Sequence, residues 1–395
     1  MCNEHIQYLT PLSNGWCDFT ENNTNENKAL RKGIQEYLLT SLQMQHLVVL
    51  AGCGTSIGEK INGPSMSELW EEIETLSTKN GIKIKRENIA DKIKYYGQNI
   101  EEFLTQCESY LQIFGAEDKK VKIFYLKSKE KILKKCSSVN TEEEALEAHR
   151  TFLYKLSRRR VRDSRLKLFT TNYDLCFERA ASYQGLIAID GFSFVEPRRF
   201  DPKYFNYDIV RRSRPGEETV SYIDGVFHLH KLNGSVNWAR IGNEIIIKNN
   251  PTPEEACLIY PAGEKYQQSY NQPFLENMAH YLSFLREPNT CIIVIGFGFN
   301  DKHISEPLIS AVKSNPHLRL IIVDKNAYKN IEVESSNCSV YWSELKKLSK
   351  RGYDISFINS SFEDFVNIIP DLKALTPAEQ LYRNIRSLVE ERDYE

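Results

Sequence analysis

The stretch LVVLAGCGTSIGEKINGPSMSELW, residues 47–70, decides the fold of this chain. It opens with four aliphatic residues, a pattern typical of a parallel strand that is buried on both faces. Gly52 and Gly54 follow at once, and glycine there allows a tight turn and a close approach of the backbone to a ligand. The stretch therefore predicts a strand, a glycine turn with free N–H groups that can meet a phosphate, and a helix.

The glycine spacing differs from the G-x-G-x-x-G fingerprint of dinucleotide-binding turns. Ile57 stands where the third glycine would be, and Gly58 comes one residue later. Taken alone, the stretch therefore leaves open a strand-to-helix turn that binds nothing.

Length and composition indicate an ordinary globular protein. The chain has 395 residues, of which 41% are hydrophobic and 26% charged, enough for a full α/β domain and roughly one further unit. The formal net charge of -2 does not favour general binding to nucleic acid or to an anionic membrane. The basic run at 158–165 is interpreted as a solvated helix end, with a nucleic-acid contact as the alternative.

Two absences guide the expected location and metal content. No apolar run approaches the ~18 residues needed to cross a bilayer, and the N-terminus MCNEHIQYLT lacks the pattern of a signal peptide. We therefore expect a cytoplasmic protein that spans no membrane. The nine cysteines are scattered and none forms a C-x-x-C pair, so we expect reduced thiols, no zinc module and no bound metal.

Further strand patterns follow downstream, and most end in a polar or glycine-rich turn. An open α/β sheet builds its ligand site in this way, at the carboxyl ends of its strands. We therefore predict the α/β class, with a Rossmann-like, open and mostly parallel sheet flanked by helices. The further predicted strands cover residues 166–170, 226–238 with a turn at 233–234, 245–247, 291–295, 318–323 and 355–358.

Between the first two strands, residues 71–164 are rich in Lys and Glu and show helical spacing, which predicts a helical insertion. Within it, Thr141-x-x-Glu144 is interpreted as a capping box that begins a helix. The predicted units are an N-terminal segment and helix (1–45), a Rossmann-like domain (46–70 and 165–370), the insertion (71–164) and a C-terminal helix (371–395).

Two pairs of polar side chains follow or occupy predicted strands. Asn172 and Asp174 stand two residues apart at a strand end, where they either cap a helix or hold and orient a water or a ribose hydroxyl. His228 and His230 share one face of a strand. They are interpreted as structural, as catalytic, or as two ligands of a metal site for which no third ligand has a recognisable spacing.

In their fixed order, these motifs resemble the sirtuin superfamily, and more specifically its bacterial sirtuin-like NAD-hydrolysing branch. The resemblance covers residues 46–70 and 165 to about 366. It is carried by AGCGTS with GPSMSEL, by TTNYD, HLHKLNGSVNW and IGFGFNDKHI, by the strand ending at Asp324, and by SFEDF at 361–365.

The resemblance implies a site that takes NAD as its substrate. Asn172 and Asp174 would be catalytic and lie near the nicotinamide ribose. The implied ligand-binding residues are Gly52, Gly54, Thr55 and Ser56 at the pyrophosphate, Gly296, Gly298 and Asn300 at the phosphates and adenosine ribose, Asp324 at the adenosine end, and the turn residues Asn233, Gly234 and Ser235.

The chain departs from the family at its general base, which is usually a histidine directly before the Gly-Ser turn. Asn233 stands there, and an amide takes no proton at neutral pH. Three alternatives follow: His230 supplies the imidazole with His228 orienting it, Asn172 alone positions the attacking water, or the protein is slow or inactive.

The resemblance implies an NAD glycohydrolase that releases nicotinamide and ADP-ribose and acts as an antiphage defence effector by depleting NAD. Deacylase sirtuins generally carry a paired C-x-x-C zinc module and a Pro-Asp-Phe-Arg sequence, and this chain has neither. Bacterial relatives of this layout imply a homo-oligomer that acts with a hexameric translocase ATPase of the HerA type. The alternative is a catalytically silent regulatory subunit of a defence complex that binds NAD or ADP-ribose.

Overall fold

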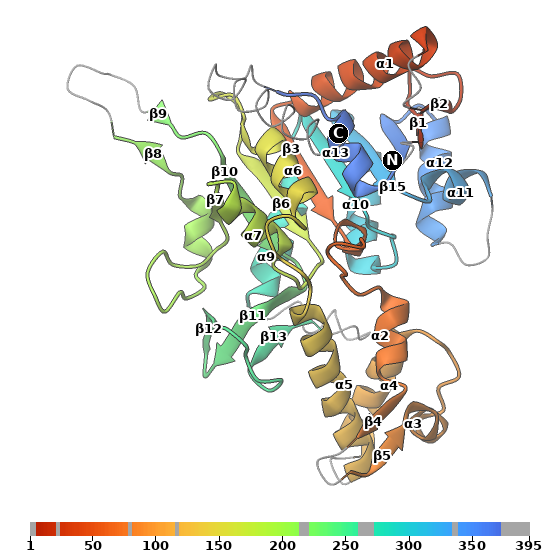
Figure 1. Ribbon diagram of the computed structural model, residues 1–395, viewed down its shortest axis with the longest axis vertical. Coiled ribbons are helices and arrows are strands. Elements are labelled where there is room, and N and C mark those ends of the chain that lie inside the picture. The colour runs from red at the N-terminus through yellow and green to blue at the C-terminus, as the bar shows by residue number, and fades with distance from the viewer. Residues whose placement is uncertain are drawn as a thin grey trace, which may run out of the picture.

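A nine-stranded sheet forms the centre of the computed structural model, which describes residues 5–20, 24–77, 81–114, 118–212, 221–259, 272–333 and 339–372 (Figure 1). The strand order is β2-β1-β16-β15-β14-β3-β6-β10-β7. All neighbours from β16 to β7 are parallel, and β1 pairs antiparallel with β16 and β2. The strands are β1 (His5–Leu9), β2 (Cys17–Thr20), β3 (His46–Ala51), β6 (Leu166–Thr170), β7 (Ile187–Ile189), β10 (Val226–Lys231), β14 (Thr290–Ile295), β15 (Leu318–Asp324) and β16 (Ile355–Asn359).

Helices cover both faces of this sheet, which confirms the predicted α/β class. The central strand shows why: Val49 packs into the core on one face and Val48 into the core on the other. The first face carries α1 (Asn25–Leu42), α6 (Glu147–Ser157), α7 (Cys176–Tyr183) and α13 (Phe362–Ile368). The second face carries α9 (Phe274–Phe284), α10 (Lys302–Ser314), α11 (Ala327–Glu332) and α12 (Val340–Lys350).

A separate helical unit lies below the sheet in Figure 1, in orange and gold. Its core is formed by aromatic and aliphatic side chains such as Phe103 and Phe124, and it reaches the rest of the molecule through Val236 and Leu258. The unit comprises α2 (Met66–Glu72), the hairpin of β4 (Thr75–Ser77) and β5 (Lys83–Lys85), α3 (Arg86–Ile93), α4 (Ile100–Phe114) and α5 (Lys119–Ser137).

The packing of α6 changes our expectation for where the insertion ends. Phe152, Leu153 and Leu156 of α6 pack into the core of the main sheet rather than into that of the helical unit. We therefore propose that the inserted unit ends near residue 139 and not at 164. The predicted capping box at Thr141 is also wrong, because α6 begins at Glu147 with Leu146 at its N-cap and no side-chain cap.

The N-terminal segment, in which the sequence analysis predicted no strand, contains β1 and β2. Ile6 and Tyr8 of β1 are buried against the sheet, and the strand pairs with β16, which lies more than 300 residues later in the chain. A strand of five residues that depends on so distant a partner carries little local signal.

The basic run at 158–165 is only partly a solvated helix end. Arg162 is exposed, but Arg159 is only 4% exposed and donates to the main-chain oxygens of Leu42, Met44 and Gln45. These carbonyls belong to the end of α1 and the turn that follows, where positive charge meets unpaired acceptors. Solvation is therefore the wrong interpretation for Arg159.

Smaller elements complete the described chain. A three-stranded antiparallel sheet is formed by β11 (Gly234–Ile241), β12 (Glu244–Ile247) and β13 (Ala256–Leu258), and a short hairpin by β8 (Val210–Arg211) and β9 (Ser221–Tyr222). Within the described ranges, no helix is long and apolar enough to cross a membrane. The predicted C-terminal helix lies outside the described residues from position 373 onward.

Candidate active site

The candidate active site is a cleft at the carboxyl ends of β3, β6 and β14. In the sheet, β3 has β6 as its neighbour on one side and β14 on the other, so the strand order changes direction at β3. Ligands of open α/β sheets bind at such a switch point. The cleft has a volume of about 140 Å³. It is lined by Cys53, Ser56, Gly63, Pro64, Met66, Leu69, Cys136, Val139, Thr171, Asn172, Tyr173, Asp174, Asn233, Gly296, Phe297, Gly298, Asn300 and Asp301.

A second cavity, of about 550 Å³, adjoins the first at Gly296, which lines both. Gly54 and Thr55 of the glycine turn contribute to its wall. Its charged residues are Glu59, Lys60, Asp324, Lys325 and Glu363. Burial raises the pKa of the Asp324 carboxyl group, and the Asn326 N–H, which donates to it over 2.7 Å, works in the opposite direction.

The glycine turn after β3 packs directly on the turn after β14. A Cβ atom on Gly54 would lie 2.6 Å from Cα of Gly296, and one on Gly52 would lie 2.6 Å from the oxygen of Gly296. Gly296 has a φ of +59°, a conformation that favours glycine. Glycine is therefore required here to let two main chains touch.

The expectation of free N–H groups in this turn is wrong for its glycines. Gly52 N–H donates to the oxygen of Ile295 over 2.9 Å, and Gly54 N–H donates to that of Gly296 over 2.9 Å. A short 3-10 helix at Cys53–Thr55 follows the strand, and the α-helix α2 begins only at Met66, where a capping box between Ser65 and Glu68 closes its first turn. The two glycine N–H groups are therefore already paired within the protein, and the binding of a phosphate at this turn stays a prediction.

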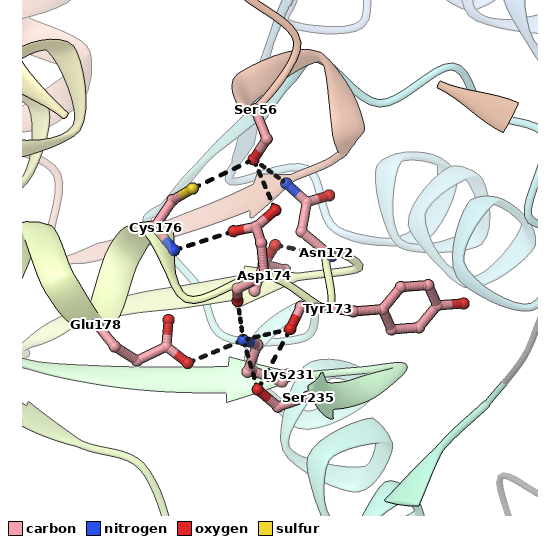
Figure 2. A network of polar contacts seen from close by, with 9 residues as sticks. Ser56, Asn172, Tyr173, Asp174, Cys176, Glu178, Lys231 and Ser235 are labelled. Atoms are coloured by element: carbon pink, nitrogen blue, oxygen red, sulfur yellow. Dashed lines mark hydrogen bonds and ion pairs between the residues drawn. The ribbon is translucent and has the colours of Figure 1, made fainter. Parts of the chain in front are cut away.

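Asn172 lies in the loop after β6, and its side-chain nitrogen is fixed by the glycine turn. Nδ2 lies 3.1 Å from the Gly52 oxygen, 3.1 Å from Thr55 Oγ1 and 3.0 Å from Ser56 Oγ. Oδ1 has no hydrogen-bond partner among the described residues, and Figure 2 shows it pointing away from Ser56. Asn172 therefore offers the cleft a fixed acceptor.

Asp174 is joined to the same group. Ser56 Oγ donates to Asp174 Oδ2 over 2.8 Å, and the Cys176 N–H donates to Oδ1 over 3.0 Å (Figure 2). The N-cap interpretation of Asn172 and Asp174 is wrong, because Leu175 is the N-cap of α7 and makes no side-chain cap. The Asp174 carboxylate nevertheless accepts from the N–H of Cys176, the first residue of the helix. An amide, a hydroxyl and a carboxylate thus form one hydrogen-bonded group at the cleft.

The loop that carries Asn172 and Asp174 is held from below by Lys231, at the end of β10 (Figure 2). Its Nζ donates to the main-chain oxygens of Tyr173 and Asp174, to Ser235 Oγ and to Glu178 Oε1. Sequence reasoning missed this lysine. Its signal is a basic residue that ends an otherwise buried strand just before the Asn-Gly turn.

His228 and His230 lie outside the cleft. His230 is fully buried, and its ring stacks on those of Phe169 and Phe205 with centroid distances of 4.6 and 4.1 Å. Burial lowers the pKa of both imidazoles well below the ordinary value, and Lys167 nearby acts in the same direction. Because successive strand residues point to opposite faces, Lys231 reaches the loop and His230 does not.

The expected ligand-binding residues divide into three groups. Ser56, Asn233, Gly296, Gly298 and Asn300 line the cleft, whereas Gly54, Thr55 and Asp324 line the second cavity. The remaining three line neither: the Gly52 oxygen accepts from Asn172, Ser235 is buried beside Lys231, and Gly234, with a φ of +88°, forms the turn.

The helical unit supplies a wall that sequence reasoning missed. Met66 and Leu69 come from α2 and Cys136 from α5, and all three line the cleft. Their apolar spacing indicates only a helix that packs on something. Among the described residues, no group of three or more His, Cys, Asp or Glu side chains is arranged to hold a metal ion.

No curated protein sequence matches the chain. Among solved structures, one described as "Structural Basis for the Mechanism and Regulation of Sir2 Enzymes" aligns with a TM-score of 0.42 at 11% identity over 87% of this chain and 98% of that one. A Sir2–p53 peptide–NAD+ structure aligns with a TM-score of 0.39 at 13% identity over 85% of this chain and 95% of that one.

The family comparison covers part of the cleft and leaves out β3, the glycine turn and the helical unit. The matched segment begins with β6 and ends within α12, so it includes the loop of Asn172 and Asp174 and the turn at Asn233. Residues 166–345 of this chain match the family model of the SIR2-like domain.

Proposed function

We propose that this protein is an NAD glycohydrolase, which cleaves NAD to nicotinamide and ADP-ribose. The observation that carries the proposal is the hydrogen-bonded group of Asn172, Ser56 and Asp174, placed in a cleft at the switch point of the sheet. The match of residues 166–345 to the SIR2-like domain supports the same substrate class.

Cleavage of the bond between nicotinamide and ribose requires the protein mainly to position the substrate and the attacking water. Nicotinamide leaves NAD as a neutral molecule, so the bond to ribose C1′ breaks without an acid and through an oxocarbenium-like transition state. Water then adds to C1′ and its proton passes to solvent. We assign the water to Asn172 Oδ1, because the nitrogen of this amide is already fixed by Gly52 and Thr55. The Asp174 carboxylate supplies negative charge near the developing cation.

The second cavity suits the adenosine half of the same molecule. Lys60 and Lys325 bring positive charge that fits a diphosphate, in place of the N–H groups that the glycine turn uses internally. The carboxylate of Asp324 can accept hydrogen bonds from ribose hydroxyls. Gly296, which lines both cavities, would then lie between the two halves of the substrate.

The biological role that we propose is antiphage defence by NAD depletion, gated by assembly into a homo-oligomer or by a hexameric HerA-type ATPase in the cytoplasm. This role is supported by the order of the sequence motifs and by the lack of a C-x-x-C pair in the sequence. NAD enters as substrate, and the proposed reaction requires no metal.

The deciding experiment measures nicotinamide and ADP-ribose after incubation of the purified protein with NAD, alone and with a candidate ATPase partner. Wild-type protein should release both products in equal amounts, and Asn172→Ala should release neither while keeping its melting temperature within a few degrees. Asn315→Ala is the matched control, since the Asn315 side chain also donates to main-chain oxygens, those of Leu285 and Glu287, and lines neither cavity. Equal release by wild type and Asn172→Ala would contradict the assigned role.

A regulatory subunit that binds NAD or ADP-ribose without cleaving it is the second candidate. The observation that favours it is the amide of Asn233 at the cleft, together with the exclusion of His230 from it. Tight NAD binding without nicotinamide release in every assembly state would establish this alternative. Asn233→His, which places an imidazole at the cleft, should raise the rate of a slow hydrolase.

A further inference from the structure

We propose that Lys231 is a positioning residue for the candidate active site. Its buried ammonium group holds the main chain at Tyr173 and Asp174, and thereby sets where Asn172 and Asp174 present their side chains (Figure 2). The kinetic consequence rests on the proposed function, whereas the structural part rests on contacts that hold whatever the reaction is.

The ammonium group of Lys231 is surrounded by four oxygen acceptors. Its side chain is 2% exposed, and Nζ lies 2.8 Å from Glu178 Oε1, 2.9 Å from Ser235 Oγ and 3.3 Å from the Tyr173 oxygen, with the Asp174 oxygen closest of all. An ammonium group has three protons and no acceptor, so four oxygens more than saturate it. Lys231 itself therefore has no proton left for a substrate.

The main chain of residues 171–175 needs this cation because it leaves the sheet after Thr170, beside Lys231. Thr170 of β6 is the register partner of Lys231, and the Leu232 N–H still donates to the Thr170 oxygen over 2.8 Å. Beyond this point the β6–β10 ladder ends, so the carbonyls at 173 and 174 need other donors. The Val236 N–H donates to the main-chain oxygen of Tyr173, and Lys231 Nζ donates to that of Asp174.

The charge of Lys231 is balanced inside the same group. Glu178 lies on α7, the helix that begins directly after Asp174, and its carboxylate is the ion-pair partner. Burial raises the pKa of Glu178, and Lys231 opposes that rise. A buried charge left without its partner is costly, so the pair ties β10 to the first turn of α7. Both ends of the loop segment 171–175 are thereby fixed.

A Lys231 that only stabilises the fold and a Lys231 that positions the loop predict different results when this residue is removed. If Lys231 only stabilised the fold, its removal would lower the melting temperature and leave kcat of the folded protein unchanged. If it positions the loop, its removal shifts the Asn172 and Asp174 side chains. A displacement of about 1 Å in such groups costs on the order of 100-fold in rate. The two roles therefore separate in kcat and in local amide exchange.

The test compares Lys231→Met with Lys155→Met. Lys155 is a matched control, because its Nζ also donates to two main-chain oxygens, those of Val366 and Ile369, and it does not line the cleft. Lys231→Met should lower kcat for nicotinamide release about 100-fold, with KM for NAD changed less than about threefold. Lys155→Met should lower only the melting temperature.

Hydrogen exchange of the Asn172 and Cys176 amides supplies a readout that needs no activity. The Cys176 N–H donates to the Asp174 carboxylate, and the Asn172 N–H donates to Thr170 Oγ1 over 3.1 Å. Lys231→Met should speed both exchange rates about tenfold relative to Lys155→Met. If wild-type protein releases no nicotinamide, the proposed function fails, and this measurement still decides the inference.

Should Lys231→Met fail to fold, the double variant Lys231→Met with Glu178→Gln replaces it, because it leaves no unpaired buried charge. The same fall in kcat and the same faster exchange are expected of it. A kcat equal to that of Lys155→Met, or unchanged exchange at Asn172 and Cys176, would overturn the assignment.

Discussion

At the scale of single residues, burial decides what the basic side chains do. His149 of α6 is fully buried between the rings of Phe177 and Phe362, at centroid distances of 4.9 and 4.8 Å. Neither ring nitrogen has a hydrogen-bond partner among the described residues. Burial lowers the pKa of this imidazole to about 4, so His149 is neutral in the folded protein near pH 7.

This depressed pKa predicts a loss of stability in mild acid. Between pH 6.5 and 4 the unfolded chain binds a proton at His149 and the folded chain does not, so the free energy of unfolding falls as the pH is lowered. One such group costs roughly 1 kcal/mol at pH 5.5 relative to pH 7.5. In urea unfolding, His149→Leu should lose about that much less stability between these two pH values.

His317→Gln is the control for this pH series, because His317 is exposed. Its stability should fall between pH 7.5 and 5.5 as much as that of the wild type. A His149→Leu variant with the full wild-type pH dependence would show that the ring is already charged in the folded protein.

The sequence predicts some residues of the candidate site, and the roles of other residues depend on contacts that the sequence does not show. Asn172 and Asp174 are visible in sequence because two polar side chains follow a buried strand. The roles of Arg159 and Lys231 are not, because each depends on carbonyl groups of segments that are distant in the chain. The sequence also suggested a catalytic role for His228 and His230, which lie outside the cleft. Their alternation along the strand shows that they share one face of the sheet, but it does not show which side chains cover that face.

At the scale of elements, the strands were predictable where they are buried on both faces. The predicted strand 166–170 coincides with β6, and 291–295 falls within β14. Such strands read as continuous apolar runs. The edge strand β2, its neighbour β1 and the β4–β5 hairpin were missed, because short strands of mixed polarity are fixed by their partners rather than by their own pattern.

The contact between the two glycine turns yields a prediction for Gly54. Gly54→Ala would place a methyl group 2.6 Å from the Cα atom of Gly296, so the turns after β3 and β14 must separate. The free energy of unfolding should fall by about 1–3 kcal/mol, as for other overpacked sites, and binding of ADP-ribose should weaken. Thermal unfolding and calorimetry would measure the two effects.

Gly15→Ala is the matched control for this substitution, since a Cβ on Gly15 would meet nothing within 4 Å. Its stability and its binding of ADP-ribose should equal those of the wild type. A Gly54→Ala protein as stable as Gly15→Ala would show that the turns adjust without cost, and that glycine is not required by their contact.

At the scale of the whole molecule, the cleft lies between two hydrophobic cores. One wall comes from the strand ends of the main sheet, and the other from α2 and α5 of the helical unit. The two bodies are joined by the chain at 56–65 and again at 138–146, and by the packing of Val236 and Leu258 against the helical unit. A ligand that fills the cleft must therefore touch both, which couples its binding to their relative placement.

Met66 of α2 gives the most direct test of this two-walled cleft. It lines the cleft and is 39% exposed, so Met66→Ala should change the free energy of unfolding by less than about 0.5 kcal/mol. Loss of the apolar contact should weaken ADP-ribose binding about 3- to 10-fold, since burying part of a methionine side chain contributes roughly 1 kcal/mol. Isothermal calorimetry with ADP-ribose measures this without requiring turnover.

Ile123 of α5 provides the matched control, because it belongs to the same helical unit, is also 39% exposed and does not line the cleft. Ile123→Ala should bind ADP-ribose as tightly as the wild type. Equal affinities for Met66→Ala and Ile123→Ala would mean that the ligand contacts the sheet alone. The helical unit would then be a neighbour of the site rather than one of its walls, and gating of the site by movement of that unit would lose its physical basis.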